Sequence, residues 1–189
     1  TKKDKPRLLW YQGDEVVQRI YRYMSKSDLV LKIEALGSYR RKKETIGDLD
    51  IAVSTYSDQK VMSYFLEFPE IKEILAEGDK KISVVLKGGL QVDFRVANPK
   101  QFGSMTQYFT GSKYHNIALR SYAISKGFSV SEYGIKKGKK LYEFATEEDF
   151  YNFLDLQYIP PEIRQGKNEV ELASQKLIPD LVKVSDIKG

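Results

Sequence analysis

The chain has 189 residues, of which 41% are hydrophobic and 30% charged, and its formal net charge is +5. This length allows one ordinary domain or two small ones, and the apolar fraction is large enough to build a core. The absence of cysteine excludes disulfides, thiolate zinc sites and cysteine nucleophiles, and it fits a cytoplasmic protein. No run of about eighteen apolar residues is present, so we expect no membrane partner.

Residues 1–100 have the pattern of a small sheet flanked by helices. Segments with helical spacing of apolar residues alternate with β-rich runs, and Gly88-Gly89 marks a hairpin between the last two runs. The predicted elements are helix 14–25, strand 29–36, a short basic helix 39–44, strand 48–54, helices 58–68 and 70–77, and strands 81–87 and 90–97. This order predicts an α+β fold.

From residue 99 onward, the pattern becomes more helical. We predict helices over residues 100–109 and 112–126, short strands over 128–130 and 132–135, and a further helix over 146–154. Thr146 is the expected N-cap of the last helix, because acidic residues fill the turn that follows it. Residues 166–189 are rich in charge and have the character of a linker or an appended segment.

Three aspartates stand in otherwise apolar strands. Asp48 and Asp50 alternate along one strand, so their side chains project from the same face, about 6 to 7 Å apart. Asp93 lies in a second strand, where an acid is equally out of place for packing. Neighbouring carboxylates are costly unless cations lie between them, and Mg²⁺ accepts such oxygen ligands. The three acids therefore predict a metal site, although an alternating aspartate pair alone also fits a solvent-facing strand edge.

A glycine-serine turn precedes the aspartate pair. The backbone N–H groups at Gly37 and Ser38 are suited to hold a triphosphate, and Arg41 would add charge-assisted hydrogen bonds. A basic turn beside paired acids favours an in-line attack on a phosphoryl group, assisted by two metal ions. The combination makes the solvent-edge interpretation of the aspartates less favourable.

Four ordered motifs resemble those of the X family of DNA polymerases. They are Gly37-Ser-Tyr-Arg-Arg41, Gly47-Asp-Leu-Asp50, Val92-Asp93 and Tyr108-Phe-Thr-Gly-Ser112. The first three fit many nucleotidyltransferases, whereas the fourth is much narrower. The resemblance implies a nucleotidyltransferase-type palm over residues 1–100, of which 1–13 are flexible, a thumb of helices and strands over 101–165, and a C-terminal extension or linker over 166–189.

The resemblance also implies a reaction. The chain would add deoxynucleotides to a primer 3′-hydroxyl, directed by a template, in the filling of gaps during DNA repair. Its cofactors would be two Mg²⁺ ions, with Mn²⁺ as a substitute. Its partners would be primer-template or gapped DNA and deoxynucleoside triphosphates, and the protein would be a monomer.

The roles of the acids and of the phosphate turn follow from the same resemblance. Asp48 and Asp50 would bridge both ions, while Asp93 would bind only the catalytic ion and help to deprotonate the 3′-hydroxyl. Ser38 and Arg41, beside Gly37, would hold the β- and γ-phosphates. Gly47 would let the backbone approach them.

The resemblance assigns the remaining site residues to the nascent base pair. The sugar would pack on the segment of Tyr108, Phe109, Gly111 and Ser112. Asn116 would reach the minor-groove edge of the incoming base and Arg120 that of the templating base. These two residues are four apart on a predicted helix and share a face with Lys113.

Two further residues have expected roles near the DNA. Arg95 would pair with Asp50 in the idle site and turn to Glu132 on closure, with Phe109 between them. His115, the only histidine, is expected to contact DNA or to be merely exposed, rather than to act as a catalytic acid.

The sequence also departs from the longer family members. Those carry an N-terminal lyase-like domain that grips DNA, and only some thirteen residues precede the first predicted helix here, so we expect that grip to be lacking. Residues 177–189 resemble the join to the PHP domain of bacterial members, which we expect to be lacking as well. Two other functions stay open: a template-independent nucleotidyltransferase acting on RNA or a small acceptor, and a non-catalytic DNA- or nucleotide-binding module.

Overall fold

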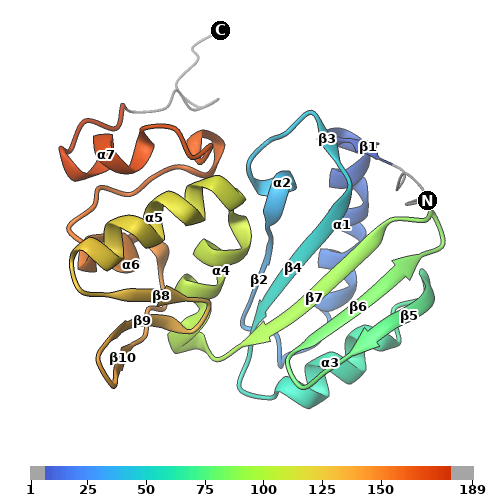
Figure 1. Cartoon of the computed structure of the whole chain (residues 1–189). Coiled ribbons are helices and arrows are strands. Elements are labelled where there is room, and N and C mark those ends of the chain that lie inside the picture. Colours follow the sequence, from blue (N-terminus) through green and yellow to red (C-terminus); the bar gives the residue numbers. More distant parts are fainter. Residues whose placement is uncertain (1–6, 180–189) are drawn as a thin grey trace, which may run out of the picture.

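A five-stranded sheet frames the first half of the chain (Figure 1). The computed structural model describes residues 7–179. The sheet has the strand order β2 (Lys32–Ala35), β4 (Asp48–Ser54), β7 (Gln91–Ala97), β6 (Lys81–Leu86) and β5 (Ile71–Glu77). Strands β4 and β7 are parallel and the other neighbours are antiparallel. The mixed sheet confirms the predicted α+β class.

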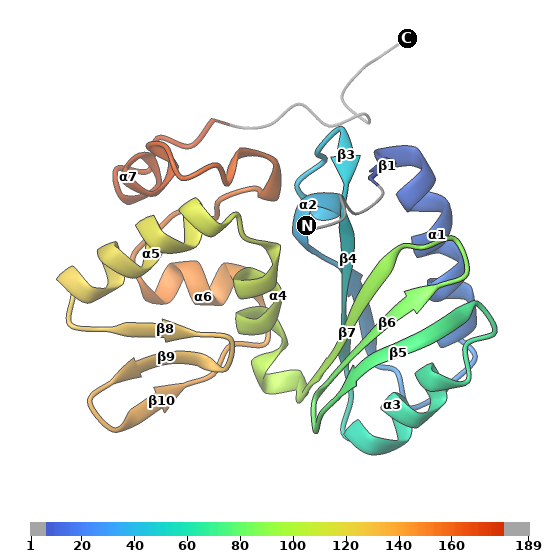
Figure 2. The same cartoon turned by 45° about the vertical axis from the view of Figure 1, so that its right-hand side comes forward.

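Alternation along the strands divides the sheet into an apolar face and a polar face. Helices α1 (Trp10–Met24) and α3 (Asp58–Leu66) cover the apolar face (Figures 1 and 2). There Phe65 of α3 stacks on Phe94 of β7 with the ring centroids 4.0 Å apart. Because successive side chains of a strand point to opposite faces, the acids next to these core residues project from the other face.

The N-terminal helix begins earlier than the sequence predicted. Helix α1 starts at Trp10, within the segment expected to be flexible, and β1 (Leu8–Leu9) before it pairs with β3 (Thr45–Ile46). The Trp10 indole donates a hydrogen bond to the carbonyl of Tyr39 and stacks on its ring. The short helix α2 (Gly37–Arg40) likewise begins two residues before the predicted basic helix.

The predicted helix over residues 70–77 is wrong, because this segment forms strand β5. Its Glu, Lys, Leu and Ala residues favour helices locally, and almost all are exposed, so no buried stripe indicates the period. Antiparallel pairing with β6 decides the conformation instead. Tertiary pairing thus overrides a weak local propensity.

Helices dominate the second half of the chain, around a separate core (Figure 2). Its elements are η1 (Pro99–Gln101), α4 (Phe102–Thr110), α5 (Lys113–Ser125), β8 (Ser129–Ser131), β9 (Gly134–Lys137), β10 (Lys140–Tyr142), α6 (Glu147–Phe153), η2 (Pro161–Ile163) and α7 (Glu169–Ser174). Thr146 caps α6 as predicted, since its hydroxyl accepts from the Asp149 N–H at 3.2 Å. Strand β10 was not anticipated.

Part of the segment that resembled a linker packs into this second core. Val170 and Ala173 of α7, and Ile178 after it, are buried there. Of the predicted extension, residues 180–189 lie outside the described part of the chain, and so does most of the segment resembling a join to a PHP domain. Within residues 7–179, no helix is long and apolar enough to cross a membrane.

Helix α4 joins the two halves of the molecule. Phe102 and Met105 of α4 are buried against Leu36, Ala52 and Ala97 of the sheet half. Ala52 and Ala97 lie on the polar side of β4 and β7, so α4 covers one end of that face. The other end carries the acids, and α4 ends beside them.

Candidate active site

The structure brings the three predicted acids together on two adjoining strands. Strands β4 and β7 run parallel, and their register sets Asp50 directly opposite Asp93. Asp48 lies two residues before Asp50 on the same face and is exposed. The side chains of Asp50 and Asp93 are only 22% and 16% exposed to solvent. Such a density of partly buried like charge requires compensating cations.

Two basic side chains supply that compensation. Nη2 of Arg95 lies 3.3 Å from Asp50 Oδ1 and 3.4 Å from Asp93 Oδ2, and Nζ of Lys81 lies 2.9 Å from Asp93 Oδ2. The Arg95 guanidinium also stacks on Phe109, 3.8 Å from the ring centroid. This is the arrangement expected of Arg95 in an idle site. Glu132, its expected partner after closure, is half-buried between β8 and β9.

The surroundings shift the pKa values of the two facing acids in opposite directions. Burial raises the pKa of Asp50 to about 6, with Arg95 opposing the rise and Asp48 adding to it. Burial also acts to raise the pKa of Asp93, but hydrogen bonds from Lys81, Ser83 and Gln91 outweigh it and lower that pKa. Asp93 therefore stays ionised under conditions in which Asp50 takes up a proton.

The donor set fits a hard divalent ion. Among residues 7–179, no three acidic or histidine side chains are gathered as an ion site, and Nη2 of Arg95 contacts both Asp50 and Asp93. The available ligands are nevertheless carboxylate oxygens on rigid strands, which suit Mg²⁺ or Mn²⁺. Displacing the Arg95 guanidinium would leave Asp48, Asp50 and Asp93 in need of positive charge.

A basic cavity of about 530 Å³ lies at the predicted phosphate turn. It is lined by Arg7, Ser38, Arg41, Lys42, Lys43, Glu44 and Thr45. Gly37 has a φ of +60°, and a Cβ there would lie 2.9 Å from Asp50 Oδ2, so only glycine brings the turn this close to the acids. The turn that contributes Ser38 to the cavity therefore also approaches Asp50.

Arg7 is a residue of this cavity that the sequence did not reveal. Its Nε donates to Thr45 Oγ1 at 3.0 Å and its Nη2 to the Thr45 carbonyl at 3.1 Å. A Cβ at Gly47 would lie 2.8 Å from Arg7 Nη1, so that glycine leaves room for the guanidinium. Nothing but its charge marked Arg7, since its segment was predicted to be flexible.

The end of α4 and the two residues after it close the site from the other half of the molecule. Arg41 donates a hydrogen bond to the Thr110 carbonyl, which ties the phosphate turn to this segment. Gly111 has a φ of +67°, and a Cβ there would lie 3.1 Å from Arg41 Nη1. Ser112 caps α5, its hydroxyl accepting from the His115 N–H at 3.3 Å. Tyr108 packs edge-on against Phe109.

Helix α5 presents the residues expected to read the base pair. Lys113 is exposed, and Asn116 and Arg120 are half-buried. The Asn116 amide donates to the Tyr108 carbonyl at 2.7 Å and accepts from Gln107 Nε2 at 3.1 Å. These contacts join Asn116 to the segment that is expected to hold the sugar.

The expectation that His115 is exposed or contacts DNA is wrong. Its side chain is fully buried, with Nδ1 2.9 Å from Glu169 and Nε2 3.0 Å from the Tyr151 hydroxyl. Position 115 faces the second core, because it lies about 100° around the helix from Asn116. Its partner Glu169 lies in the segment that had the character of a linker, so no local signal indicated the contact.

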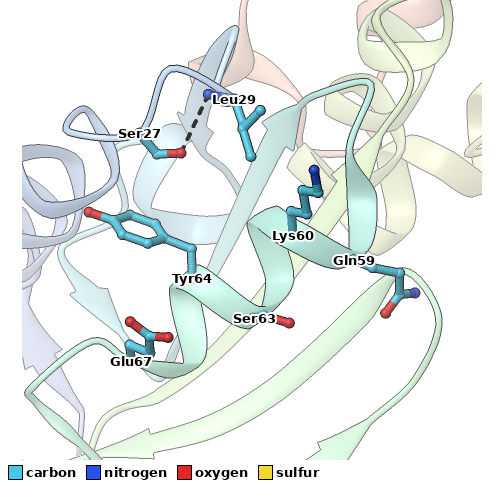
Figure 3. Close-up of a pocket in the computed structure, with 7 residues that line it drawn as sticks. All are labelled: Ser27, Leu29, Gln59, Lys60, Ser63, Tyr64 and Glu67. Carbon is cyan, nitrogen blue, oxygen red and sulfur yellow. Dashed lines mark hydrogen bonds between the residues drawn. The ribbon is translucent and has the colours of Figure 1, made fainter.

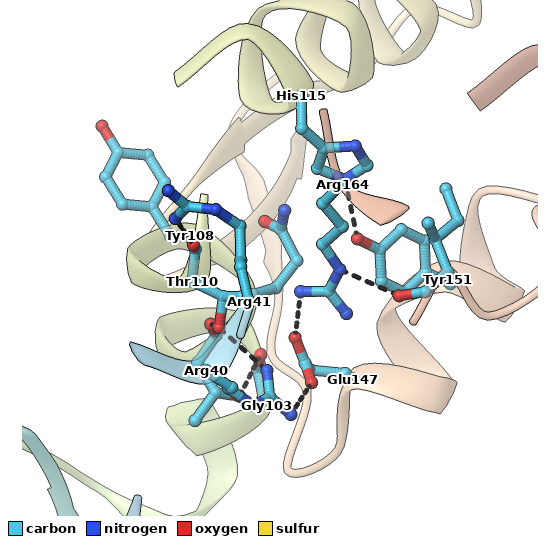
Figure 4. Close-up of polar contacts among 12 residues, drawn as sticks. Arg40, Arg41, Gly103, Tyr108, Thr110, His115, Glu147, Tyr151 and Arg164 are labelled. Atoms are coloured by element: carbon cyan, nitrogen blue, oxygen red, sulfur yellow. Dashed lines mark hydrogen bonds and ion pairs between the residues drawn. The ribbon is translucent and has the colours of Figure 1, made fainter. Parts of the chain in front are cut away.

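A buried ionic cluster, which the sequence did not predict, links the two halves beside the phosphate turn (Figure 4). Arg40 Nη2 lies 2.6 Å from Glu147 Oε2, and Arg164 Nη1 lies 2.7 Å from Glu147 Oε1. Burial acts to raise the pKa of Glu147, but the two arginines outweigh it and lower that pKa. Arg40 also donates to the Thr110 hydroxyl at 2.8 Å. The cluster therefore helps to set where the end of α4 lies.

A second hollow, of about 400 Å³, lies away from these residues (Figure 3). Its lining comes from α3 and the loop after α1: Ser27, Leu29, Gln59, Lys60, Ser63, Tyr64 and Glu67. Lys60 is the single cationic residue of this lining, so the hollow lacks the charge density of the basic cavity at the predicted phosphate turn.

Known proteins share both halves of this architecture. A family described as DNA polymerase beta palm matches residues 6–120, and one described as DNA polymerase beta thumb matches residues 105–165. The chain is 37% identical over 178 residues to the DNA polymerase/3′-5′ exonuclease PolX of Bacillus subtilis. The alignment covers 92% of this chain and 31% of that protein.

Two eukaryotic proteins are also similar. DNA polymerase lambda of Rattus norvegicus is 28% identical over 157 residues, covering 67% of this chain and 27% of that protein. DNA polymerase IV of Saccharomyces cerevisiae is 30% identical over 98 residues, covering 50% of this chain and 17% of that protein. The chain thus spans less than a third of the length of each relative.

Proposed function

Because the chain belongs to the X family of DNA polymerases, we propose that it holds the centre for template-directed addition of deoxynucleotides to a primer 3′-hydroxyl. One observation carries the proposal: Asp48, Asp50 and Asp93 share one face of two parallel strands, and the glycine turn that leads into the basic cavity approaches Asp50. A phosphate chain in that cavity would place its reacting phosphorus beside the acids. Phosphoryl transfer needs this juxtaposition of anion-binding groups and metal ligands.

The acids would hold two Mg²⁺ ions, with Mn²⁺ as a substitute. Asp48 and Asp50 would bind both ions, and Asp93 would bind the one nearer the primer end. The ions would supply positive charge to the phosphates and lower the pKa of the attacking hydroxyl. Arg95 must leave Asp50 before that carboxylate can serve, so its position would regulate the start of the reaction.

The nucleotide would lie between the phosphate turn and the end of α4. Ser38, Arg41 and Arg7 would bind its phosphates, with the backbone at Gly37 and Gly47 close to them. Its sugar would pack on the segment of Tyr108, Phe109, Gly111 and Ser112. Salt-dependent binding is expected of such a basic cavity, because phosphate contacts release counterions.

The nascent base pair would lie against α5. Asn116 would reach the minor-groove edge of the incoming base, and Arg120 that of the templating base. Lys113, exposed on the same face, would meet the DNA backbone. The minor groove is suited to this reading because acceptors occur at equivalent places in every base pair.

We further propose that the substrate is primer-template or gapped DNA, as in repair, and that the chain acts as a monomer. The experiment is primer extension with each deoxynucleotide and each ribonucleotide, with and without a template strand. Deoxynucleotide incorporation that requires the template is expected. Equal incorporation without a template would instead indicate a template-independent nucleotidyltransferase.

Asp93→Asn tests the chemistry within the same assay. Losing a metal ligand removes several kcal/mol of transition-state stabilisation, so incorporation should fall about 1000-fold. Glu73→Gln is the matched control, since Glu73 is an exposed acid on the edge strand β5 of the same sheet. Comparable rates for Asp93→Asn and Glu73→Gln would refute the assignment of the site.

A further inference from the structure

A buried chain of polar side chains begins at Glu169 in α7. Glu169 is only 4% exposed, and its carboxylate accepts from the N–H of Gly166 at 2.5 Å and of Lys167 at 2.8 Å. It also contacts His115 Nδ1 at 2.9 Å. Burial acts to raise its pKa, but the hydrogen bonds from His115 and Gly166 outweigh it and lower the pKa to about 2. Glu169 is therefore an anion that only accepts hydrogen bonds.

That anion fixes the tautomer of His115. Since Glu169 cannot donate, His115 must carry its proton on Nδ1 and leave Nε2 as an acceptor. Nε2 lies 3.0 Å from the Tyr151 hydroxyl, which must then donate to it. Burial lowers the pKa of His115, and with nearby Arg164 it outweighs the hydrogen bond to Glu169, which acts to raise that pKa, so the neutral ring is favoured.

The chain continues from Tyr151 through Gln107 to Asn116. The Gln107 side chain lies close to the Tyr151 phenol. Gln107 Nε2 also donates to Asn116 Oδ1 at 3.1 Å. Asn116 Nδ2 in turn donates to the Tyr108 carbonyl at 2.7 Å. A row of polar contacts thus runs from Glu169 to Asn116, and the carboxylate sets the direction of its first two donors, His115 and Tyr151.

The orientation of Gln107 is maintained at a cost. Its carbonyl oxygen is buried and has no hydrogen-bond partner among the described residues. A buried acceptor without a partner is unfavourable. An amide held in this way indicates that its NH₂ group is needed where it points, at Tyr151 and Asn116.

The backbone of the same segment fits against the start of α5. Gly166 has a φ of +76°, and a Cβ there would lie 2.3 Å from the Tyr114 Cβ and 2.8 Å from the His115 nitrogen. The Ser112 N–H donates to the Arg164 carbonyl at 3.3 Å. The start of the helix that carries Asn116 is therefore held by the chain that leads into α7.

We propose that Glu169 and His115 are positioning residues, which act through Tyr151 and Gln107 to orient the Asn116 amide for the incoming base. Segment 166–178 would then set how firmly the minor-groove edge of the nucleotide is read. This inference rests on the proposed role of Asn116. It adds to that role a source of order outside the site, in residues that contact no substrate.

A cycle of protein and nucleotide variants isolates the effect. In 3-deaza-dATP a C–H group replaces the N3 acceptor of adenine, which is the atom that Asn116 would bind in the minor groove. In single-turnover incorporation opposite thymine, the wild-type chain should bind this analogue about tenfold more weakly than dATP. Asn116→Ala should reduce the ratio of the two dissociation constants, analogue over dATP, to near one.

Tyr151→Phe is the decisive variant, because it removes only the Tyr151 hydroxyl and keeps the packed ring. It should weaken dATP binding and reduce the ratio to about twofold, with the maximal rate changed less than the affinity. Tyr122→Phe is the matched control, since the Tyr122 hydroxyl donates to the Leu154 carbonyl at 3.2 Å in the same core. It should keep the tenfold ratio.

A second measurement tests the row of polar contacts from Glu169 to Asn116 without an activity assay. The protein has one histidine, so its ¹⁵N resonances are assigned without ambiguity. They should show the Nδ1–H tautomer in the wild type and a mixture of tautomers in Glu169→Gln. A single unchanged tautomer in that variant would contradict the role of Glu169.

The outcomes separate the inference from the proposed function. A tenfold ratio kept by Tyr151→Phe but lost by Asn116→Ala would overturn the positioning chain and leave the function standing. A ratio of one in the wild type would overturn the role of Asn116 itself, and the inference with it. A reduced ratio in Tyr151→Phe but not in Tyr122→Phe would support the positioning of Asn116 by Glu169 and His115.

Discussion

Arg95 occupies the place beside Asp50 that a metal ion would need, with its guanidinium 3.3 Å from the carboxylate. The same guanidinium stacks on Phe109, which belongs to the last turn of α4. Movement of Phe109 would therefore be coupled to release of Asp50. The electrostatics of the acids and the position of the thumb are linked through one side chain.

Arg95→Ala should change the rate of closure. Removing the guanidinium abolishes both its contact with Asp50 and its stacking on Phe109, so the single-turnover incorporation rate should change several-fold. Arg19→Ala is the control, because Arg19 forms an ion pair with Glu70 at 2.7 Å outside the site. Equal incorporation rates in both variants would rule out a switch at Arg95.

Asp50→Asn should stabilise the fold at neutral pH while it abolishes incorporation. The pKa of Asp50 is raised from 3.8 to about 6, so the folded state binds a proton that the unfolded chain releases between those values. The ionised carboxylate therefore costs stability above about pH 6. Unfolding by urea should show the variant to be about 1 to 3 kcal/mol more stable at pH 7.5, and this advantage should disappear below about pH 4.

Asp93→Asn gives the opposite sign and serves as the matched comparison. The folded-state pKa of Asp93 is lowered, so its ionised form contributes stability that is present above its unfolded pKa and is lost as the pH falls through its folded pKa. The variant should be less stable than the wild type at pH 7.5. The same sign for both variants would contradict the opposed pKa shifts.

Local pattern was sufficient to predict that Asp48 and Asp50 share a face, because a strand places side chains on alternate faces. The position of Asp93 opposite Asp50 follows instead from the parallel register of β4 and β7. Thr146 was equally predictable, because N-capping depends on the residues of a single turn. Both predictions rest on contacts that are close in sequence or on a strict period.

Contacts between distant segments were not predictable in this way. His115 is buried because Glu169, 54 residues later, supplies an acceptor for its ring. Arg7 reaches the phosphate cavity because β1 pairs with β3, which brings it beside Thr45. In each case the residue type fits several environments, and only the tertiary arrangement selects one.

Glu147→Ala should be among the most destabilising substitutions in the chain. It would leave Arg164, whose side chain is fully buried, without its carboxylate partner, and would leave Arg40 with Glu34 as its remaining carboxylate partner. Breaking a buried ion pair by removing one partner costs about 3 to 5 kcal/mol. Lys176→Ala is the control, since it removes an exposed pair with Asp155, and such pairs contribute about 1 kcal/mol or less. Equal losses in urea unfolding would contradict the cluster's role.

Trp10 should report phosphate binding directly. It is the only tryptophan, and it lies under Lys42, with the ammonium 3.9 Å from the ring centroid, at the edge of the phosphate cavity. An anion in the cavity would draw Lys42 from the ring and change its emission. Titration with tripolyphosphate should therefore give a saturable change in fluorescence, which weakens as salt is added.

Arg41→Ala tests whether that signal arises from the cavity. Losing one charge-assisted contact of about 1.5 to 3 kcal/mol should weaken the apparent affinity by at least tenfold. Lys60→Ala removes a cation from the second hollow, which is lined from α3 and not from the phosphate turn, and should leave the titration unchanged (Figure 3). Equal weakening by the two variants would mean that tripolyphosphate binds through general surface charge, because only Arg41 lies where a specific phosphate site requires it.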